Sequence, residues 1–115
     1  MTPPTVYVLQ EITVTAGKGQ AFLDAYMKGF APGARDRGMV LERTLVNPPL
    51  WLDDRASTIV FTWAVQGVPG VWKMIASGRG TPAVEGFWDE VAPMVQHRAQ
   101  RLFVEPADME ALSHV

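Results

Sequence analysis

Strand-like and helix-like apolar patterns follow one another along this chain in the order strand, helix, strand, strand, helix, strand. Val6 to Thr15 is rich in Val, Ile, Tyr and Thr, which predicts a strand whose successive side chains point to opposite faces. From about Gln20 to Asp36, the apolar residues instead recur at helical spacing, with Phe22, Tyr26 and Phe30 four positions apart. One strand–helix–strand half followed by another predicts an α+β, ferredoxin-like βαββαβ domain, with an antiparallel sheet and both helices on one face.

The other elements are predicted by the same patterns and by glycine and proline breaks. Pro32 should kink or restart the first helix, and Gly38 should end it. Thr81 can cap a helical segment that has Pro82 at its first position. The remaining predicted elements are a strand over 39–47, a loop over 50–56, a strand over 57–65, a helix over 71–77, a helical segment over 82–96 and a strand over 98–105.

Length and composition indicate a single domain over 1–115, with its core at about 6–105 and a C-terminal tail over 106–115. The net charge is −2 and the ten basic residues are scattered, so no basic stripe predicts nucleic-acid binding. No apolar stretch approaches the roughly 20 residues that span a bilayer, and no signal peptide is recognisable. The chain has no cysteine, which fits a cytoplasmic protein and removes thiolate chemistry.

Apolar side chains occur on both faces of the predicted strands. In the first strand, Tyr7 and Leu9 point one way, while Val8 and Ile12 point the other. Helices on one face of an antiparallel sheet leave the opposite face uncovered. A second copy of the chain is the simplest cover for that face, so we expect a homodimer.

Several segments resemble the dimeric α+β barrel superfamily and, within it, the NIPSNAP-like branch. The strand ending in Thr13-Val14-Thr15, followed by Ala16-Gly17-Lys18, resembles the opening of these proteins. Phe30-Ala31-Pro32 resembles the branch's helix with an internal proline, which a glycine and the second strand follow. The strand 59–63 and the segment 87–104 are similar to the third strand and to the C-terminal helix and strand.

This resemblance implies a fold and a type of site, but no single activity. The superfamily includes cofactor-free monooxygenases, polyketide cyclases, muconolactone isomerase and haem-degrading enzymes, so its fold alone does not decide the function. It implies a dimeric α+β barrel with a pocket between the sheet and its helices that binds a small, often aromatic molecule. The cyclases use a histidine early in the second helical region, where this chain has Ser77-Gly78-Arg79-Gly80-Thr81 and no histidine.

Three residues are candidates for catalysis. His97 lies at the junction of the last helix and strand, where it is either an exposed junction residue or a general acid or base at the pocket rim. Glu11 and Arg43 are charges within otherwise apolar strands. They are either a structural ion pair, charges at a sheet edge, or a carboxylate base beside a guanidinium that holds a substrate carboxylate or enolate.

Aromatic residues are the candidates for contact with a substrate. Trp63, Trp72 and Trp88 occupy positions that suit either the core or an aromatic-lined pocket. Trp51 stands beside Leu50 and Leu52 in a polar, proline-flanked loop, and we expect it to cover the pocket mouth or to contact the partner subunit. The full set of predicted substrate contacts is Tyr7, Trp51, Phe61, Trp63, Trp72 and Trp88.

Three functions remain open at this point. The first is a cofactor-independent enzyme that acts on a small aromatic or polyketide-like acid by proton transfer, as an isomerase, cyclase, decarboxylase or lyase. The second is a cofactor-free monooxygenase of the anthrone-oxidising type, and the third is a non-catalytic dimer that binds a small ligand. No metal-ligand spacing and no phosphate-binding glycine loop is present, so we expect neither a metal nor a nucleotide cofactor.

Overall fold

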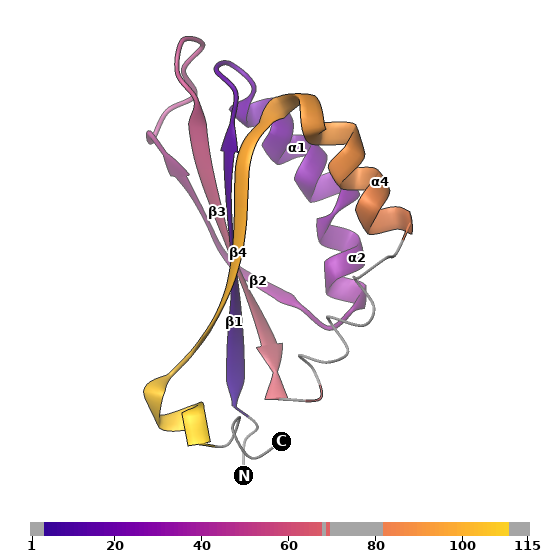
Figure 1. Cartoon of the computed structure of the whole chain (residues 1–115), viewed down its shortest axis with the longest axis vertical. Helices are drawn as coiled ribbons and strands as arrows, with labels where there is room; N and C mark the ends of the chain where they lie inside the picture. Colours follow the sequence, from indigo (N-terminus) through magenta and orange to yellow (C-terminus); the bar gives the residue numbers. More distant parts are fainter. Residues whose placement is uncertain (1–3, 68, 70–81, 111–115) are drawn as a thin grey trace.

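The fold of the chain follows the predicted order of strands and helices (Figure 1). It is described here in a computed structural model for residues 4–67, 69 and 82–110, so the helix predicted over 71–77 lies outside the described residues. The strands are β1 (Thr5–Val14), β2 (Val40–Asn47), β3 (Ser57–Gln66) and β4 (Val95–Val104). The helices are α1 (Gly19–Gly29), α2 (Ala31–Asp36) and α4 (Pro82–Val91), with short 3-10 helices at Ala92–Met94 and Pro106–Asp108.

The four strands form one antiparallel sheet in the order β2-β3-β1-β4. β1 lies in the centre with β4 along one side and β3 along the other, and it pairs with both along nearly its full length. A register shift interrupts β2 between Leu41 and Arg43, and another interrupts the β1–β4 pair at Thr13 and Val14. This strand order makes β2 and β4 the edges of the sheet and confirms the predicted ferredoxin-like arrangement.

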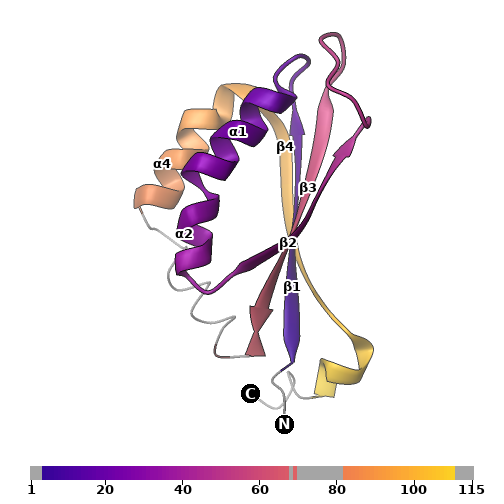
Figure 2. The same ribbon diagram turned by 180° about the vertical axis from the view of Figure 1, so that it is seen from behind.

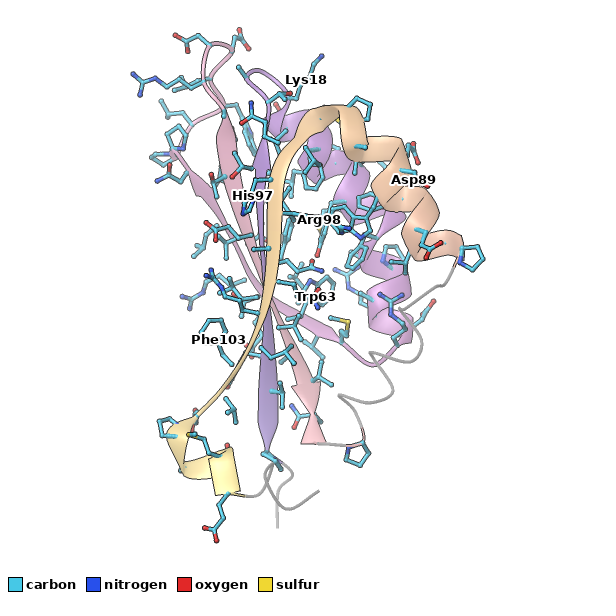
Figure 3. All side chains as sticks on the ribbon, in the orientation of Figure 1. Lys18, Trp63, Asp89, His97, Arg98 and Phe103 are labelled. Atoms are coloured by element: carbon cyan, nitrogen blue, oxygen red, sulfur yellow. The ribbon has the colours of Figure 1, made fainter. Side chains whose placement is uncertain are left out.

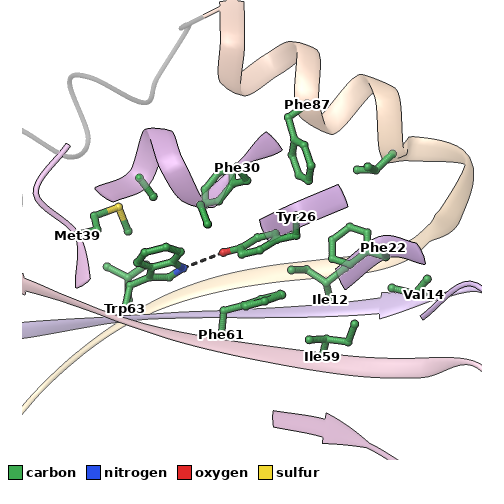
Figure 4. Close-up of a cluster of buried hydrophobic side chains, with 14 of the residues drawn as sticks. Ile12, Val14, Phe22, Tyr26, Phe30, Met39, Ile59, Phe61, Trp63 and Phe87 are labelled. Atoms are coloured by element: carbon green, nitrogen blue, oxygen red, sulfur yellow. Dashed lines mark hydrogen bonds between the residues drawn. The ribbon is translucent and has the colours of Figure 1, made fainter. Parts of the chain in front are cut away.

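All the described α-helices cover the same face of the sheet (Figure 2). Between them and the sheet lies an aromatic core in which Phe22, Tyr26, Phe61 and Trp63 are fully buried (Figure 4). The Tyr26 and Phe61 rings stack with their centroids 3.7 Å apart and an interplanar angle of 15°. Burial of rings this large makes the helix-covered face the main source of stability for a single chain.

The opposite face of the sheet has no element of the described chain over it (Figures 1 and 2). β1 shows the contrast between the faces directly, because its residues alternate between half-buried and fully buried positions from Thr5 to Val14. Val40, Leu45 and Phe103 are about half exposed on this open face, at 59%, 52% and 47%. We call this surface the open face below.

Prolines and a glycine set several element boundaries, of which two agree with the prediction and two differ from it. Pro32 lies at the start of α2, directly after the break that separates it from α1, as expected of a residue that restarts a helix. Gly38 has a φ of +89° and ends α2 as predicted. The helical segment predicted over 82–96 ends at Val91 instead, and β4 begins at Val95 rather than at Arg98. Pro93 explains both corrections, because it cannot donate the helical hydrogen bond and disfavours helical backbone at the residue before it.

Candidate functional site

A pocket of about 280 Å³ opens on the helix-covered side of the sheet, between α4 and the β1–β4 edge. On this side of the sheet, β4 contributes the polar side chains of Arg98 and Gln100. Arg98 pairs with Ile12 and Gln100 pairs with Gln10 across the strands. The lining residues are Gln10, Ile12, Trp88, Arg98, Ala99 and Gln100. Its volume is near the lower end of the roughly 300–1,000 Å³ typical of small-molecule sites.

The cation in this pocket is held by an aromatic ring. The Arg98 guanidinium carbon lies 4.0 Å from the centre of the Trp88 ring, a close cation–π contact. The Trp88 ring packs against Phe87, with the ring centroids 5.0 Å apart, and stacks on Phe22, with the centroids 6.4 Å apart. Burial lowers the pKa of Arg98 from its usual value, although an arginine remains charged at any physiological pH. Among the described residues no carboxylate pairs with Arg98, so its charge is available to a ligand.

A chain of hydrogen bonds connects the core to this pocket. The Trp63 Nε1–H donates to the Tyr26 hydroxyl oxygen at 2.8 Å (Figure 4). The Tyr26 hydroxyl donates a short hydrogen bond to Gln10 Oε1, and Gln10 Nε2 donates to Gln100 Oε1 at 3.1 Å. Four side chains from β3, α1, β1 and β4 are therefore joined in one line, and the last two of them line the pocket.

Tyr26 remains neutral in this network. Its burial raises the pKa of the phenol far above its usual value, and this outweighs the opposing effects of the Trp63 hydrogen bond and the nearby Arg37 charge. The hydroxyl is therefore a permanent donor at physiological pH rather than a base. Gln10 is the buried polar residue that receives this hydrogen bond, with 5% of its surface exposed.

The three predicted catalytic residues lie on the open face, away from this pocket. Glu11 and Arg43 share that face, but β3 runs between their strands. The Glu11 carboxylate instead forms an ion pair with Arg101 at 3.1 Å, on a substantially exposed part of β4. Figure 3 shows His97 on the side of β4 opposite to Arg98. Any catalytic role for these three residues would thus require chemistry on the open face.

The aromatic residues predicted to contact a substrate lie in several different parts of the structure. Trp88 lines the pocket, whereas Phe61 and Trp63 are fully buried in the core. Tyr7 lies on the open face, opposite Ala64 and Phe103. Trp72 lies outside the described residues. Of the five predicted contacts that the structure describes, one therefore lines the pocket, and the roles of all six remain predictions.

Trp51 lies at the start of α1 and is not part of the pocket lining. A Cβ added to Gly19 would approach its ring to 2.7 Å, so the indole occupies the space beside that glycine. The ring is nevertheless 40% exposed. Contact between Trp51 and a partner subunit remains a prediction.

The sequence prediction missed all three polar residues of the pocket, namely Gln10, Arg98 and Gln100. Gln10 offered a signal, because it stands between Val8 and Ile12 on the apolar side of the first strand. A polar residue in such a row needs a hydrogen-bond partner, and the partner is often part of a site. Arg98 and Gln100 offered no comparable signal, since their face depends on where β4 begins.

No group of three or more histidine, aspartate or glutamate side chains in the described ranges is arranged to hold a metal ion. None of the helices in residues 4–67 and 82–110 is both long and apolar enough to cross a membrane.

Comparison with solved structures identifies the fold class. The chain matches an uncharacterised NIPSNAP domain protein from Burkholderia xenovorans with a TM-score of 0.67 and 20% identity, over 89% of this chain and 95% of that one. It matches a putative antibiotic biosynthesis monooxygenase from Nitrosomonas europaea with a TM-score of 0.64 and 14% identity, over 92% and 94% of the two chains. These matches show that the chain shares the ferredoxin-like α+β fold of a NIPSNAP domain protein and of a monooxygenase-like protein, so the fold predicted from the sequence is confirmed.

A third similar structure has a described activity. SnoaB from Streptomyces nogalater, a cofactor-independent oxygenase, matches with a TM-score of 0.57 and 16% identity, over 90% of this chain and 94% of that one. Identities this low establish the shared fold and nothing finer. No protein-family model matches the sequence. No curated protein sequence matches it either.

Proposed function

We propose that this protein is a cofactor-independent enzyme that binds a small aromatic or polyketide-like acid as an anion in the pocket between α4 and β4. The observation that carries the proposal is the Arg98 guanidinium over the Trp88 ring, without a carboxylate partner among the described residues. A guanidinium is suited to a planar oxyanion such as a carboxylate, phenolate or enolate. The edge of the Trp88 indole would add apolar contact with the ring system of the ligand.

Stabilising an anion is the chemistry that the described pocket offers. Arg98 would lower the free energy of an enolate or phenolate formed from the substrate, and the amide groups of Gln10 and Gln100 would add hydrogen bonds. An enolate held in this way can be reprotonated at another carbon, which is the step shared by isomerases, cyclases and many lyases. Glu11 or His97 would have to supply the base for that reaction, yet both lie on the open face.

Oxygenation is the second candidate reaction, and one observation favours it. Neither a carboxylate nor an imidazole is among the described residues that line the pocket, so a general base is missing there. In a cofactor-free oxygenation the substrate anion itself reduces oxygen, so a substrate that binds already deprotonated, having lost its proton to solvent, needs no base from the protein. A methylene carbon is converted by O₂ to a carbonyl, with one oxygen atom retained and the other released as water with the two hydrogens of that carbon. The oxygenase with the same fold gives this candidate added support.

Turnover with and without oxygen separates these reactions. The purified chain would be incubated with anthrone, which can lose a proton to form a stabilised anion, in the presence of a chelator and without added flavin. Oxygen uptake with formation of anthraquinone supports the oxygenase. Solvent deuterium exchange into the substrate under nitrogen, accelerated by the protein, supports proton transfer instead. Binding without either reaction leaves the non-catalytic ligand-binding function.

Arg98→Met tests the part that the pocket plays. Methionine retains an apolar contact with Trp88 but removes the charge, so ligand affinity and any turnover should fall by about 10- to 100-fold. Arg35→Met is the matched control, because Arg35 is exposed on α2 and is not a lining residue. If both variants behave like the parent protein, the pocket is not the site and the proposal is wrong.

We also propose that two copies pair through the open face to form the dimer of an α+β barrel. The half-exposed Val40, Leu45 and Phe103 support this, since apolar residues on an uncovered sheet are typical of an interface. Pairing would bring the Glu11–Arg101 ion pair into the interface as well. The strands of the two copies would then enclose a shared interior, as in the proteins with this fold.

A further inference from the structure

The hydrogen-bond chain that ends at the pocket has a direction that its first member sets. Trp63 Nε1 carries a hydrogen and has no acceptor lone pair, so it can only donate. The Tyr26 oxygen, 2.8 Å away, must therefore accept that hydrogen bond. The hydroxyl hydrogen of Tyr26 is then directed to the other near neighbour of this oxygen, the side chain of Gln10.

The donor-to-acceptor direction that Trp63 sets continues through the side chains of both glutamines. A hydroxyl donor requires the carbonyl end of Gln10, so Oε1 faces Tyr26 and the amino group faces β4. The amino group can only donate, and it meets the carbonyl end of Gln100 at 3.1 Å. The amino group of Gln100 is consequently the end left over. Turning either amide around would set two donors against each other, inside the core in the case of Gln10.

We infer that the pocket selects planar ligands whose head group only accepts hydrogen bonds, such as a carboxylate, phenolate or enolate, because the chain from Trp63 to Gln100 presents N–H donors there. Gln100 offers its amino group, and Gln10 offers the second hydrogen of its own. Arg98 is likewise a donor without an acceptor site. Every polar side chain of the described lining is thus a donor toward the ligand. Tyr26 and Trp63 are positioning residues, because they act through Gln10.

This inference rests on the proposed function, and it explains why uncharged glutamines accompany Arg98. A lone guanidinium attracts any anion, whereas amide donors held in fixed directions also select for the position of the acceptor oxygens. The amides achieve this without adding charge. A ligand with a donor head group, such as an amine, would meet the Arg98 charge and the amide N–H groups, so it would bind less favourably than an acceptor.

A series of ligands with one ring system tests the inference directly. Naphthoate, naphthalene and naphthylmethylammonium share the bicyclic ring but carry an acceptor head group, none and a donor head group. Titration by calorimetry should give the tightest binding for naphthoate, with naphthylmethylammonium weaker by about 100-fold or more. Naphthalene that binds as tightly as naphthoate would overturn both the inference and the anion site of the proposed function. Naphthoate that binds more tightly than naphthalene, with naphthylmethylammonium as tight as naphthoate, would overturn the inference alone. No binding by any of them would overturn both.

Gln100→Glu replaces the hydrogen-bond donor that faces the pocket with an acceptor, and it keeps the acceptor oxygen that faces Gln10. The glutamate still accepts from Gln10 Nε2, but it turns a carboxylate oxygen to the pocket in place of the amino group. Naphthoate affinity should fall by at least about tenfold, and naphthylmethylammonium affinity should rise. The matched control is Gln66→Glu. Gln66 is exposed at the end of β3 and, like Gln100, accepts a side-chain hydrogen bond through Oε1, here from Thr5. Equal effects of the two substitutions would show that only added charge matters and would overturn the inference.

Tyr26→Phe tests whether the direction comes from the core. The variant removes the donor to Gln10 without changing a lining residue, so both amides become free to turn. The affinity ratio of naphthoate to naphthylmethylammonium should fall several-fold. The side-chain ¹⁵N–¹H signals of Gln100, assigned with Gln100→Glu, should lose their response to naphthoate. A merely structural role for Tyr26 would lower stability and leave both the ratio and the signals as in the parent protein, which would overturn the positioning role.

Discussion

The two faces of the sheet are built from the same strands yet differ in what they can do. On β3, Ile59, Phe61 and Trp63 point to the helices and are fully buried, whereas Val60 and Thr62, their immediate neighbours, are half-buried on the open face. The helix-covered face also contains the pocket and the hydrogen-bond chain that leads to it. The open face carries exposed apolar side chains and one ion pair. This contrast assigns the core to the first face, together with the ligand under the proposed function, and makes the second face suited to a partner.

The largest expected effect comes from removing a ring on the helix-covered face. Phe61→Ala should lower the free energy of unfolding by about 3–5 kcal/mol, because it removes the ring stacked on Tyr26 and leaves a cavity. Thr62→Ala, the next residue on the same strand, should cost less than about 1 kcal/mol. Urea denaturation of both variants at one protein concentration measures the difference. Similar costs at the two positions would contradict the division between the faces.

A charge placed on the open face should break the dimer. Leu45→Glu puts a carboxylate on a half-exposed apolar position of β2, where burial against a second copy would be unfavourable by several kcal/mol. Sedimentation at micromolar concentration should give about twice the chain mass of 12.7 kDa for the parent protein and a single chain for the variant.

The control for this experiment adds the same charge to the helix layer. Ala83→Glu changes an exposed residue of α4 and should leave the dimer unaltered. A parent protein that sediments as one chain would remove the dimer proposal, whatever the variants do. Dissociation by both variants would show that net charge, rather than the open face, controls assembly.

The buried phenol should make the fold sensitive to alkali. The pKa of Tyr26 is raised in the folded protein, and it is about 10 in the unfolded chain. Above pH 10 the unfolded state therefore loses a proton that the folded state keeps, so stability falls as pH rises. The slope for this one group should approach about 1.4 kcal/mol per pH unit. Urea denaturation between pH 8 and 11 should show a shallower decline for Tyr26→Phe, and identical slopes for the two proteins would contradict the buried position of the hydroxyl.

The sequence was sufficient for the fold because its patterns are regular. Alternation in β1 and helical spacing in α1 depend only on side-chain period, and both elements were placed within one residue of their start. The end of α4 was harder to predict from the sequence, since Val95 and Gln96 suit a helix as well as a strand. Only Pro93 separates the two readings, and a three-residue error there decides which face Arg98 occupies.

The site was less predictable, because a charged residue within an apolar strand can be recognised in the sequence, whereas the hydrogen-bond partner of a buried polar residue cannot. Glu11 and Arg43 are conspicuous in apolar strands, yet both are at least partly exposed on the open face, where an ion pair costs little. Gln10 is uncharged and buried, and its meaning depends on Tyr26, sixteen residues away in the chain. A contact between residues that far apart comes from tertiary packing, which local patterns do not describe.

The smallest expected effect concerns Trp51, and it decides to which face this ring belongs. Gly19→Ala would place a methyl group within 2.7–2.9 Å of the Trp51 ring, so the indole must move. Alanine also favours a helix over glycine by about 0.5–1 kcal/mol, so the net loss of stability should be near 1 kcal/mol. In a Trp51→Ala background the clash with the ring disappears and only the approach to Ser57 Oγ, also 2.7 Å, remains, so the same change at Gly19 should cost less. A double-mutant cycle by urea denaturation measures this coupling, at a concentration at which assembly is constant. Additive effects would show that the ring does not rest on α1, and would favour its predicted contact with the partner subunit instead.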